Sequence, residues 1–199
     1  MEGFFDVVHR QRACRTFDDR PGDDATVERI LDAATFAPSA ENRQPWVFVV
    51  VRDAARRAEI GEVGRRAWEA GGRAHSTGRL EPGRLADVER GATGGVAAAP
   101  VLVVVCGDTD RGHPATLGAS IFPAVENLLL AATALGLGSA MTTLPLATGG
   151  EALGAVLGLP SSVLAMAVVP LGWPARALGP PRRAPVAEKA HRERYGQPW

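Results

Sequence analysis

The chain has 199 residues, enough to bury a sizeable core, and this length predicts one domain. Lysine plus arginine and aspartate plus glutamate number 22 each, so the zero formal net charge gives no general attraction to nucleic acid or to an anionic membrane. Two cysteines are too few for a disulfide framework, the four histidines lack metal-site spacing, and no uninterrupted apolar run reaches ~18–20 residues, so we expect neither a metal nor a membrane span.

The first predicted elements are two helices and a strand. Apolar side chains on one face predict a helix up to about Arg12, and the acidic start MEGFFD is not a signal peptide, so we expect a cytoplasmic location. A second helix has Asp23 or Asp24 as its N-cap and ends before Pro38. The apolar run at residues 47–51 then predicts a short buried strand.

The middle of the chain combines an amphipathic helix with an irregular segment. The spacing of apolar residues predicts the helix at residues 55–74. Residues 71–95 are rich in glycine, arginine and small hydroxyl residues, and they predict a mobile excursion with a short helix near residues 84–90. Trp68 either packs in the core, the favoured interpretation, or belongs to a lid over a site. A second strand is predicted at residues 101–106.

The C-terminal half is predicted to hold two helices, a strand and an arm. Residues 125–137 are apolar nearly all round, which predicts a central buried helix. Thr148 and Glu151 have the spacing of a capping box for a further helix. Residues 164–171 predict the third strand. Residues 173–199 hold five of the fifteen prolines and predict an extended arm over the surface or onto a partner subunit.

The order of these elements predicts a sheet layered with helices, and periodicity alone favours parallel strands. Gly136 and Gly138 follow a helix rather than a strand, which excludes a dinucleotide-binding fingerprint, and the sequence has neither a P-loop nor a G-x-S-x-G motif. Residues 141–143 would be a short extended piece whose backbone amides lie near the sheet edge, although packing is the ordinary explanation for it.

Residues 37–46, APSAENRQPW, are the most informative motif. Proline and small residues in a turn let backbone N–H groups point outward, and the amides of Asn42 and Gln44 can read the edge of a heterocycle. The strand that follows places the turn at a sheet end, where sites tend to lie. An ordinary proline-rich turn before a strand is the alternative.

Arginines are grouped at both ends of the chain. Arg10, Arg12 and Arg15 follow the first helix with spacings that can bring their guanidinium groups around one anion. A solvated helix end, where cations oppose the helix dipole, is the favoured alternative. Arg182 and Arg183 form a second basic pair, which either converges on the same anion or keeps the arm soluble.

Four segments, in this order, resemble the FMN-dependent nitroreductase family over nearly the whole chain. They are QRACRTF at residues 11–17, APSAENRQPW, ENLLLAATALGLGSA at residues 126–140 and VVPLGWP at residues 168–174. The resemblance implies an α+β three-layer sandwich, with a mixed and mostly antiparallel sheet flanked by helices, in place of a parallel sheet. It implies an intertwined homodimer with two FMN molecules at the interface. Residues 1–199 would form a single FMN-binding domain, with residues 61–95 as a variable excursion or lid.

The resemblance also implies which residues contact FMN. Three residues near the N-terminus would contact the phosphate and the ribityl chain, and five residues of APSAENRQPW would come from the other subunit. Two residues after the central helix lie where the Thr143 backbone N–H would face flavin N5, and an arginine of the arm would lie near the phosphate. The set is Arg12, Ala13, Arg15, Pro38, Ser39, Ala40, Asn42, Gln44, Thr143, Leu144 and Arg183, with Arg182 as the alternative to Arg183. Gln11, Arg12 and Ala13 stand where the family often has Arg-Arg-Ser, and Arg10 is the cation that can compensate.

The function that the resemblance implies is the reduction of nitroaromatics, quinones or related electron-poor acceptors with NAD(P)H, by a ping-pong mechanism on FMN. Such chemistry needs no protein nucleophile or general base, which suits a chain without a convincing catalytic triad. Two alternatives stay open. One is an FMN-dependent oxidase or dehydrogenase of a peptide-derived or secondary-metabolite substrate, and the other is a flavin-binding module without turnover.

Overall fold

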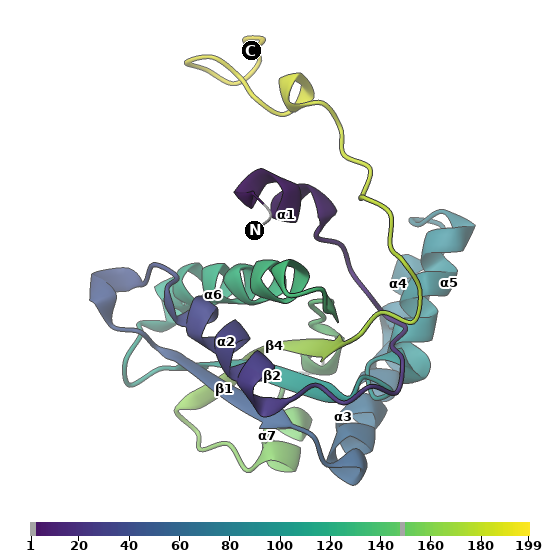
Figure 1. The fold of residues 1–199 in the computed structure, drawn as a ribbon. Coiled ribbons are helices and arrows are strands. Elements are labelled where there is room, and N and C mark those ends of the chain that lie inside the picture. The colour runs from purple at the N-terminus through teal and green to yellow at the C-terminus, as the bar shows by residue number, and fades with distance from the viewer. Residues whose placement is uncertain (1–2, 148–149) are drawn as a thin grey trace.

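A four-stranded antiparallel sheet lies between two layers of helices (Figure 1). The computed structural model describes residues 3–147 and 150–199. Within them the strands are β1 (Trp46–Val51), β2 (Val101–Asp108), β3 (Gly138–Ser139) and β4 (Val163–Gly172), in the sheet order β1-β2-β4-β3. The α-helices are α1 (Phe4–Arg10), α2 (Asp24–Thr35), α3 (Ala54–Ala67), α4 (Arg73–Ser76), α5 (Pro82–Arg90), α6 (Pro114–Ala134) and α7 (Glu151–Leu157).

Runs of β-branched residues form this sheet, as the sequence predicts. The central strand β2 is almost entirely buried and pairs with β1 on one side and β4 on the other. Every pair of named strands is antiparallel. The parallel arrangement favoured by periodicity is therefore wrong, and the mostly antiparallel sheet is confirmed. A parallel pairing occurs in the isolated bridge between Ala13 and Ser139. Residues 47–51 belong to an edge strand with partly exposed side chains, because an apolar run does not reveal which strand lies in the centre.

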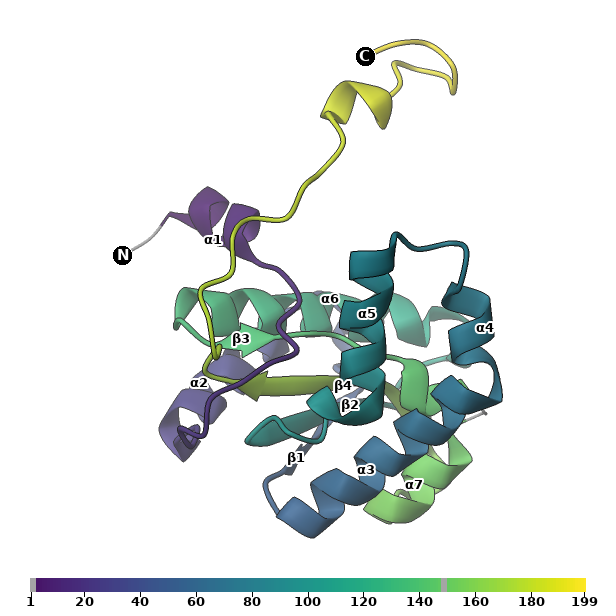
Figure 2. The same ribbon diagram turned by 90° about the vertical axis from the view of Figure 1, so that its right-hand side faces the viewer.

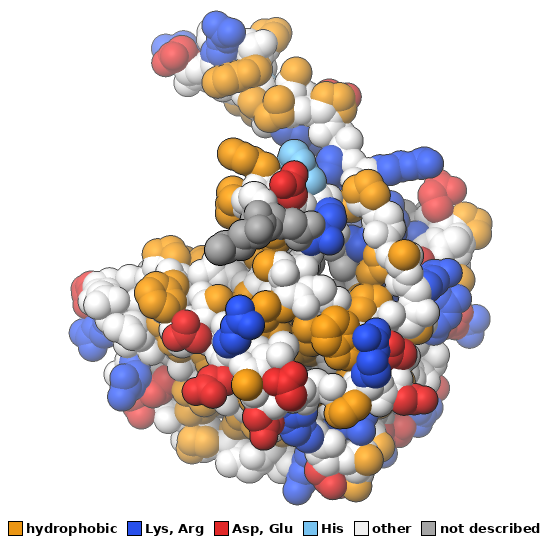
Figure 3. Space-filling view, viewed as in Figure 1, with side chains coloured by type: hydrophobic (Ala, Val, Ile, Leu, Met, Phe, Trp, Pro, Cys, Tyr) orange, Lys and Arg blue, Asp and Glu red, His pale blue; other side chains and the backbone are white. Residues whose placement is uncertain are grey.

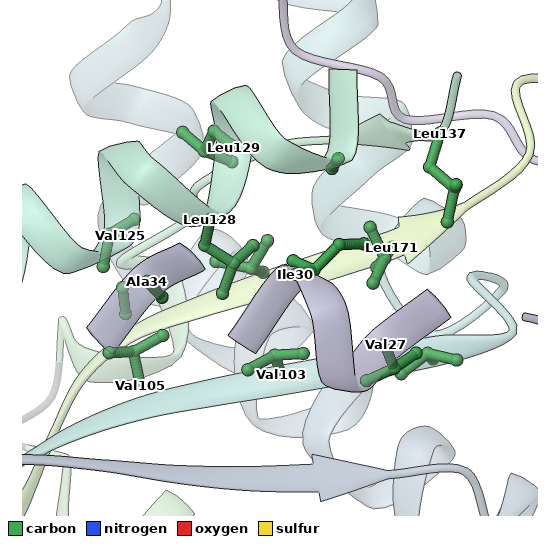
Figure 4. Close-up of a cluster of buried hydrophobic side chains, with 14 of the residues drawn as sticks. Val27, Ile30, Ala34, Val103, Val105, Val125, Leu128, Leu129, Leu137 and Leu171 are labelled. Carbon is green, nitrogen blue, oxygen red and sulfur yellow. The ribbon is translucent and has the colours of Figure 1, made fainter. Parts of the chain in front are cut away.

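Helices α2 and α6 cover one face of the sheet and enclose the larger part of the core (Figure 4). Figure 4 shows the α2 side chains between α6 and the strands, with Ile30 beside Leu128 and Leu171. All three are fully buried. Burying an aliphatic side chain of this size stabilises the fold by about 1.5–3 kcal/mol. The predicted apolar stripe of the second helix is therefore confirmed as a core face.

The central helix α6 is longer than the sequence predicts. It begins at Pro114, because proline at the first helical position loses no hydrogen bond, and it continues through Pro123. By length and composition alone α6 could cross a membrane, and 44% of its 18-residue apolar stretch is buried inside the protein. Ile121 and Leu128 are fully buried between α2 and the sheet, so packing in the protein interior explains its apolar composition.

The predicted caps have mixed outcomes. Asp23 is the N-cap of α2, where its carboxylate accepts a 2.7 Å hydrogen bond from the Thr26 N–H, so that prediction is confirmed. Thr148, half of the predicted capping box, lies outside the described residues. Helix α7 follows Gly150 and ends at Gly158, whose φ of 65° is a backbone conformation that favours glycine.

Helices α3 and α7 cover the opposite face of the sheet, and a mostly helical excursion follows α3. The helix predicted at residues 55–74 stops at Ala67, where the π-helical turn η2 (Trp68–Gly72) leads into α4. A second π-helical turn, η3 (Gly91–Gly95), follows α5. We call the segment from η2 to η3, residues 68–95, the excursion. Figure 2 shows α4 and α5 side by side within it.

The C-terminal arm leaves the body of the molecule after β4 (Figures 1 and 2). Its start is held by a 3.1 Å hydrogen bond from the Ala175 N–H to the Thr16 carbonyl. Beyond the short turn η5 (Val186–Glu188), the side chain of Tyr195 is 94% exposed. The arm thus extends away from the body of the molecule, and its docking on a partner subunit stays a prediction.

Candidate functional site

A cavity of about 790 Å³ lies between the excursion and the segment that follows β3. Arg15 contributes from the N-terminal segment, residues 140–147 form one wall, and the excursion forms the other. Small-molecule sites typically have volumes of ~300–1,000 Å³, so this cavity is large enough for a ligand of several rings.

Arg15 brings a positive charge to the cavity. Its side chain is half-buried, and within residues 3–147 and 150–199 its guanidinium donates no hydrogen bond. Burial lowers the pKa of Arg15, as expected when a cation loses hydration, and the negative charge of Asp87 acts in the opposite direction. A half-buried cation without a hydrogen-bond acceptor favours an anionic ligand at this point.

The segment after β3 offers backbone donors to the same cavity. Thr142 exchanges two 2.9 Å backbone hydrogen bonds with Val168, which fixes the segment at the sheet edge. The Leu144 N–H donates to the Thr142 hydroxyl oxygen at 3.2 Å. The Thr143 N–H has no acceptor in the described part of the chain. Thr143 and Leu144 both line the cavity with Arg15, and the Thr143 N–H is the one that a ligand can use.

Three other predicted residues do not line the cavity. Arg12 is exposed and donates a 2.9 Å hydrogen bond to the Gly179 carbonyl, which ties the N-terminal segment to the start of the arm. Ala13 lies in the bridge to Ser139. Arg183 is exposed on the arm, and its guanidinium donates to the Arg182 carbonyl at 3.1 Å.

The APSAENRQPW turn lies at the other end of the molecule, where the chain passes from α2 to β1 (left in Figure 1). The Ser39 hydroxyl accepts from the Gln44 N–H at 3.0 Å, and the Gln44 side-chain amide donates to the Asn42 side-chain oxygen at 3.3 Å. Glu41, Asn42 and Gln44 have φ values of 54°, 55° and 51°. Left-handed backbone at non-glycine residues is costly and is concentrated at functional sites.

Within one chain the predicted residues therefore divide into three groups, of which Arg12, Ala13 and Arg183 are the one described above. The cavity contains Arg15, Thr143 and Leu144. The turn, with Pro38, Ala40 and Asn42 exposed to solvent, contributes nothing to it.

The cavity also contains residues that sequence reasoning did not assign to a site. From the excursion they include Trp68, Gly72, His75, Ser76 and Gly91. Trp68 is 3% exposed, so the core interpretation is confirmed, yet it also lines the cavity, and its indole N–H has no acceptor in the described residues. In the sequence, the glycine pairs at residues 71–72 and 94–95 were the feature that could have indicated these residues, because the two π-helical turns lie there.

Exposed apolar side chains lie on the two segments that extend from the body. Orange side chains are visible on α1 and along the arm in Figure 3. The larger ones are Phe4, Phe5, Val186, Tyr195 and Trp199. Apolar surface of this kind is typical of protein–protein contact.

Comparison with known proteins matches the chain to one family. The Nitroreductase family model matches residues 8–173. A protein of Archaeoglobus fulgidus named "Putative NADH dehydrogenase/NAD(P)H nitroreductase" is 32% identical over 177 residues, which cover 87% of each chain. The 5,6-dimethylbenzimidazole synthase of Rhodospirillum rubrum is 36% identical over 183 residues, which cover 87% of this chain and 82% of the relative.

A solved structure from Desulfovibrio desulfuricans, described as "a putative nitroreductase in complex with FMN", has a similar fold. Its TM-score is 0.75 and its sequence identity is 26%, over 98% of this chain and 99% of the other.

Proposed function

This chain belongs to the nitroreductase family, and we propose that it is an FMN-dependent oxidoreductase that reduces nitroaromatic, quinone or related electron-poor acceptors with NAD(P)H. The observation that carries this proposal is the half-buried Arg15 guanidinium, which has no hydrogen-bond acceptor in the described chain, in a cavity that also contains the unpaired Thr143 N–H. A cytoplasmic location is part of the proposal.

The donors around the cavity fit FMN. A phosphate carries up to two negative charges and binds guanidinium groups through charge-assisted hydrogen bonds of about 1.5–3 kcal/mol each. Arg15 supplies such a group, and Arg12 lies three residues earlier, on the segment that contacts the arm. Arg183, a few residues farther along the arm, is our candidate for a further phosphate contact.

The segment after β3 supplies neutral donors for the ring system. FMN, when bound, takes up a hydride from the nicotinamide and delivers electrons to the acceptor. We assign the Thr143 N–H to flavin N5, because the Leu144 N–H is already donated to the Thr142 hydroxyl. An oriented backbone donor stabilises negative charge without reorganising, so this N–H would favour the reduced cofactor.

A homodimer completes the proposed site. Pro38, Ser39, Ala40, Asn42 and Gln44 would contact FMN bound to the partner chain. The support is that the turn is distant from the cavity of its own chain, exposed and held in a left-handed backbone conformation. The exposed apolar side chains of α1 and the arm also favour contact with a second copy.

The relative named 5,6-dimethylbenzimidazole synthase favours a second candidate. The second candidate is an FMN-dependent oxidase or dehydrogenase of a peptide-derived or secondary-metabolite substrate, which takes electrons from that substrate and not from NAD(P)H. Both candidates require flavin in the same cavity, and they differ in the source of electrons.

One anaerobic experiment tests the proposal. The purified protein is reconstituted with FMN and titrated with NADH or NADPH while the flavin absorbance is followed, and menadione or nitrofurazone is then added. We expect bleaching by a nicotinamide and recovery of the oxidised spectrum by the acceptor. Protein that takes up no FMN would contradict the proposal, whereas FMN that neither nicotinamide bleaches would favour the second candidate.

A further inference from the structure

Two glycines of η3 leave room for Arg15. A Cβ atom placed on Gly91 would lie 2.8 Å from Cδ and 3.3 Å from Nε of Arg15. A Cβ atom on Gly95 would lie 2.7 Å from the backbone oxygen of Arg15. The distances of 2.7 and 2.8 Å are shorter than van der Waals contact, so a side chain at either position requires Arg15 or η3 to shift.

Backbone conformation does not explain the glycine at position 91. Gly91 is buried and helical, with φ −60° and ψ −47°, and alanine in a helix is favoured over glycine by about 1 kcal/mol. Gly83 of α5 has open space around the corresponding position. The contact with the Arg15 side chain is therefore the feature that calls for glycine at position 91.

The backbone on both sides of Arg15 is held in place. On one side of it, the Cys14 N–H donates to the Ser139 carbonyl at 2.9 Å, and on the other side the Thr16 carbonyl accepts from Ala175 at 3.1 Å. Cys14 is itself packed closely, since a Cβ atom on Gly138 would lie 2.6 Å from its sulfur. With the backbone held on both sides, a methyl group at position 91 would displace the side chain and its guanidinium.

We propose that Gly91 is a positioning residue that sets the direction of the Arg15 guanidinium toward the cofactor phosphate. The inference rests on the proposed function, because it requires that Arg15 binds this phosphate. Asp87, one helical turn before Gly91, is the acidic neighbour that acts on Arg15, and it is paired with Arg90 at 2.9 Å. The end of α5 thus supplies both the space and the counter-charge for Arg15, and the excursion that forms one wall of the cavity also orients the anion-binding group.

The test measures FMN dissociation constants of the apoprotein by flavin fluorescence, together with the thermal midpoint of each apoprotein. Gly91→Ala should weaken FMN binding by about tenfold or more, as loss of a supporting contact typically does, with a thermal midpoint close to that of the parent protein. Gly83→Ala, in the same excursion, is the matched control and should bind FMN as the parent does.

A double-mutant cycle separates this role from a purely structural one. In an Arg15→Ala background the methyl group has no side chain to displace, so Gly91→Ala should cause no further loss of affinity. An equal loss in both backgrounds, or unchanged FMN binding by Gly91→Ala, would overturn the inference. If Arg15→Ala itself leaves FMN affinity unchanged, the proposed function loses its phosphate contact, and that failure is distinct from a failure of Gly91 alone.

Discussion

Replacement of Arg15 by alanine should greatly weaken cofactor binding and leave the stability of the empty protein almost unchanged. The guanidinium makes no hydrogen bond within the described residues, so its removal leaves no buried partner unpaired, and Asp87 keeps its ion pair with Arg90. The side chain is half-buried and its pKa is lowered by burial, which means that the folded chain bears a desolvation cost for this cation. The apoprotein of Arg15→Ala should therefore unfold within about 0.5 kcal/mol of the parent.

FMN binding should respond much more strongly. If the guanidinium forms two charge-assisted hydrogen bonds with the phosphate, at about 1.5–3 kcal/mol each, their loss amounts to about 3–6 kcal/mol. This corresponds to a dissociation constant raised by about 10²–10⁴-fold.

Fluorescence titration with FMN and urea unfolding of the apoprotein measure the two effects. Arg84→Ala, which removes an exposed arginine of α5, controls for the loss of one positive charge from the excursion. A clearly destabilised apoprotein with unchanged FMN affinity would show that Arg15 is a structural cation and would refute this reasoning.

Three further predictions concern the fold. Leu128→Ala, at a fully buried position of α6, should lower the free energy of unfolding by about 2–5 kcal/mol, and an unchanged urea midpoint would contradict the assignment of α6 to the core. Hydrogen bonds from Arg65 and Arg66 lower the pKa of Glu62 from 4.5 to about 2 in the folded chain. The stability that these bonds give to the fold is therefore present above the unfolded pKa and is lost as the pH falls from about 4.5 toward 2. Glu62→Gln should remove that part of the pH dependence of the thermal midpoint, and an identical acid profile would contradict it. Burial raises the pKa of Cys106 to about 12, so an aromatic disulfide reagent should label this thiol only in urea, and rapid labelling of the native protein would contradict its burial.

Features that depend on neighbouring residues were predictable from the sequence. The cap at Asp23 involves the N–H of Thr26, and both the residue type and the spacing are visible in the chain. The apolar runs that form β2 and β4 were placed within a few residues for the same reason. The short helix predicted near residues 84–90 corresponds to α5, whereas the helical turns η2, α4 and η3 around it were not predicted from the glycine-rich composition.

Features that depend on distant parts of the chain were not predictable in this way. The run at residues 47–51 does not reveal that β1 is an edge strand, because that depends on which strands pair. The start of α6 was missed because prolines at 114 and 123 are typical helix breakers, although the first is tolerated at an N-terminus.

In the candidate site, too, some residues were identified from the sequence and others depend on contacts between distant parts of the chain. Arg15, Thr143 and Leu144 were identified through the family resemblance, and the structure brings them to one cavity. The contacts of Trp68 and Gly91 were invisible, since they arise only when the excursion packs against the N-terminal segment and η4 (Leu144–Leu146).

Our main proposal is that each FMN is held by Arg15 of one chain and the APSAENRQPW turn of another. Its most direct test is co-expression of Arg15→Ala and Asn42→Ala chains with different affinity tags, followed by isolation of mixed dimers and measurement of bound flavin. Each mutant homodimer should be depleted of FMN, whereas the mixed dimer pairs the intact Arg15 of one chain with the intact Asn42 of the other and should bind one FMN. A mixed dimer as empty as the two homodimers, or a parent protein that binds FMN as a monomer, would contradict the account.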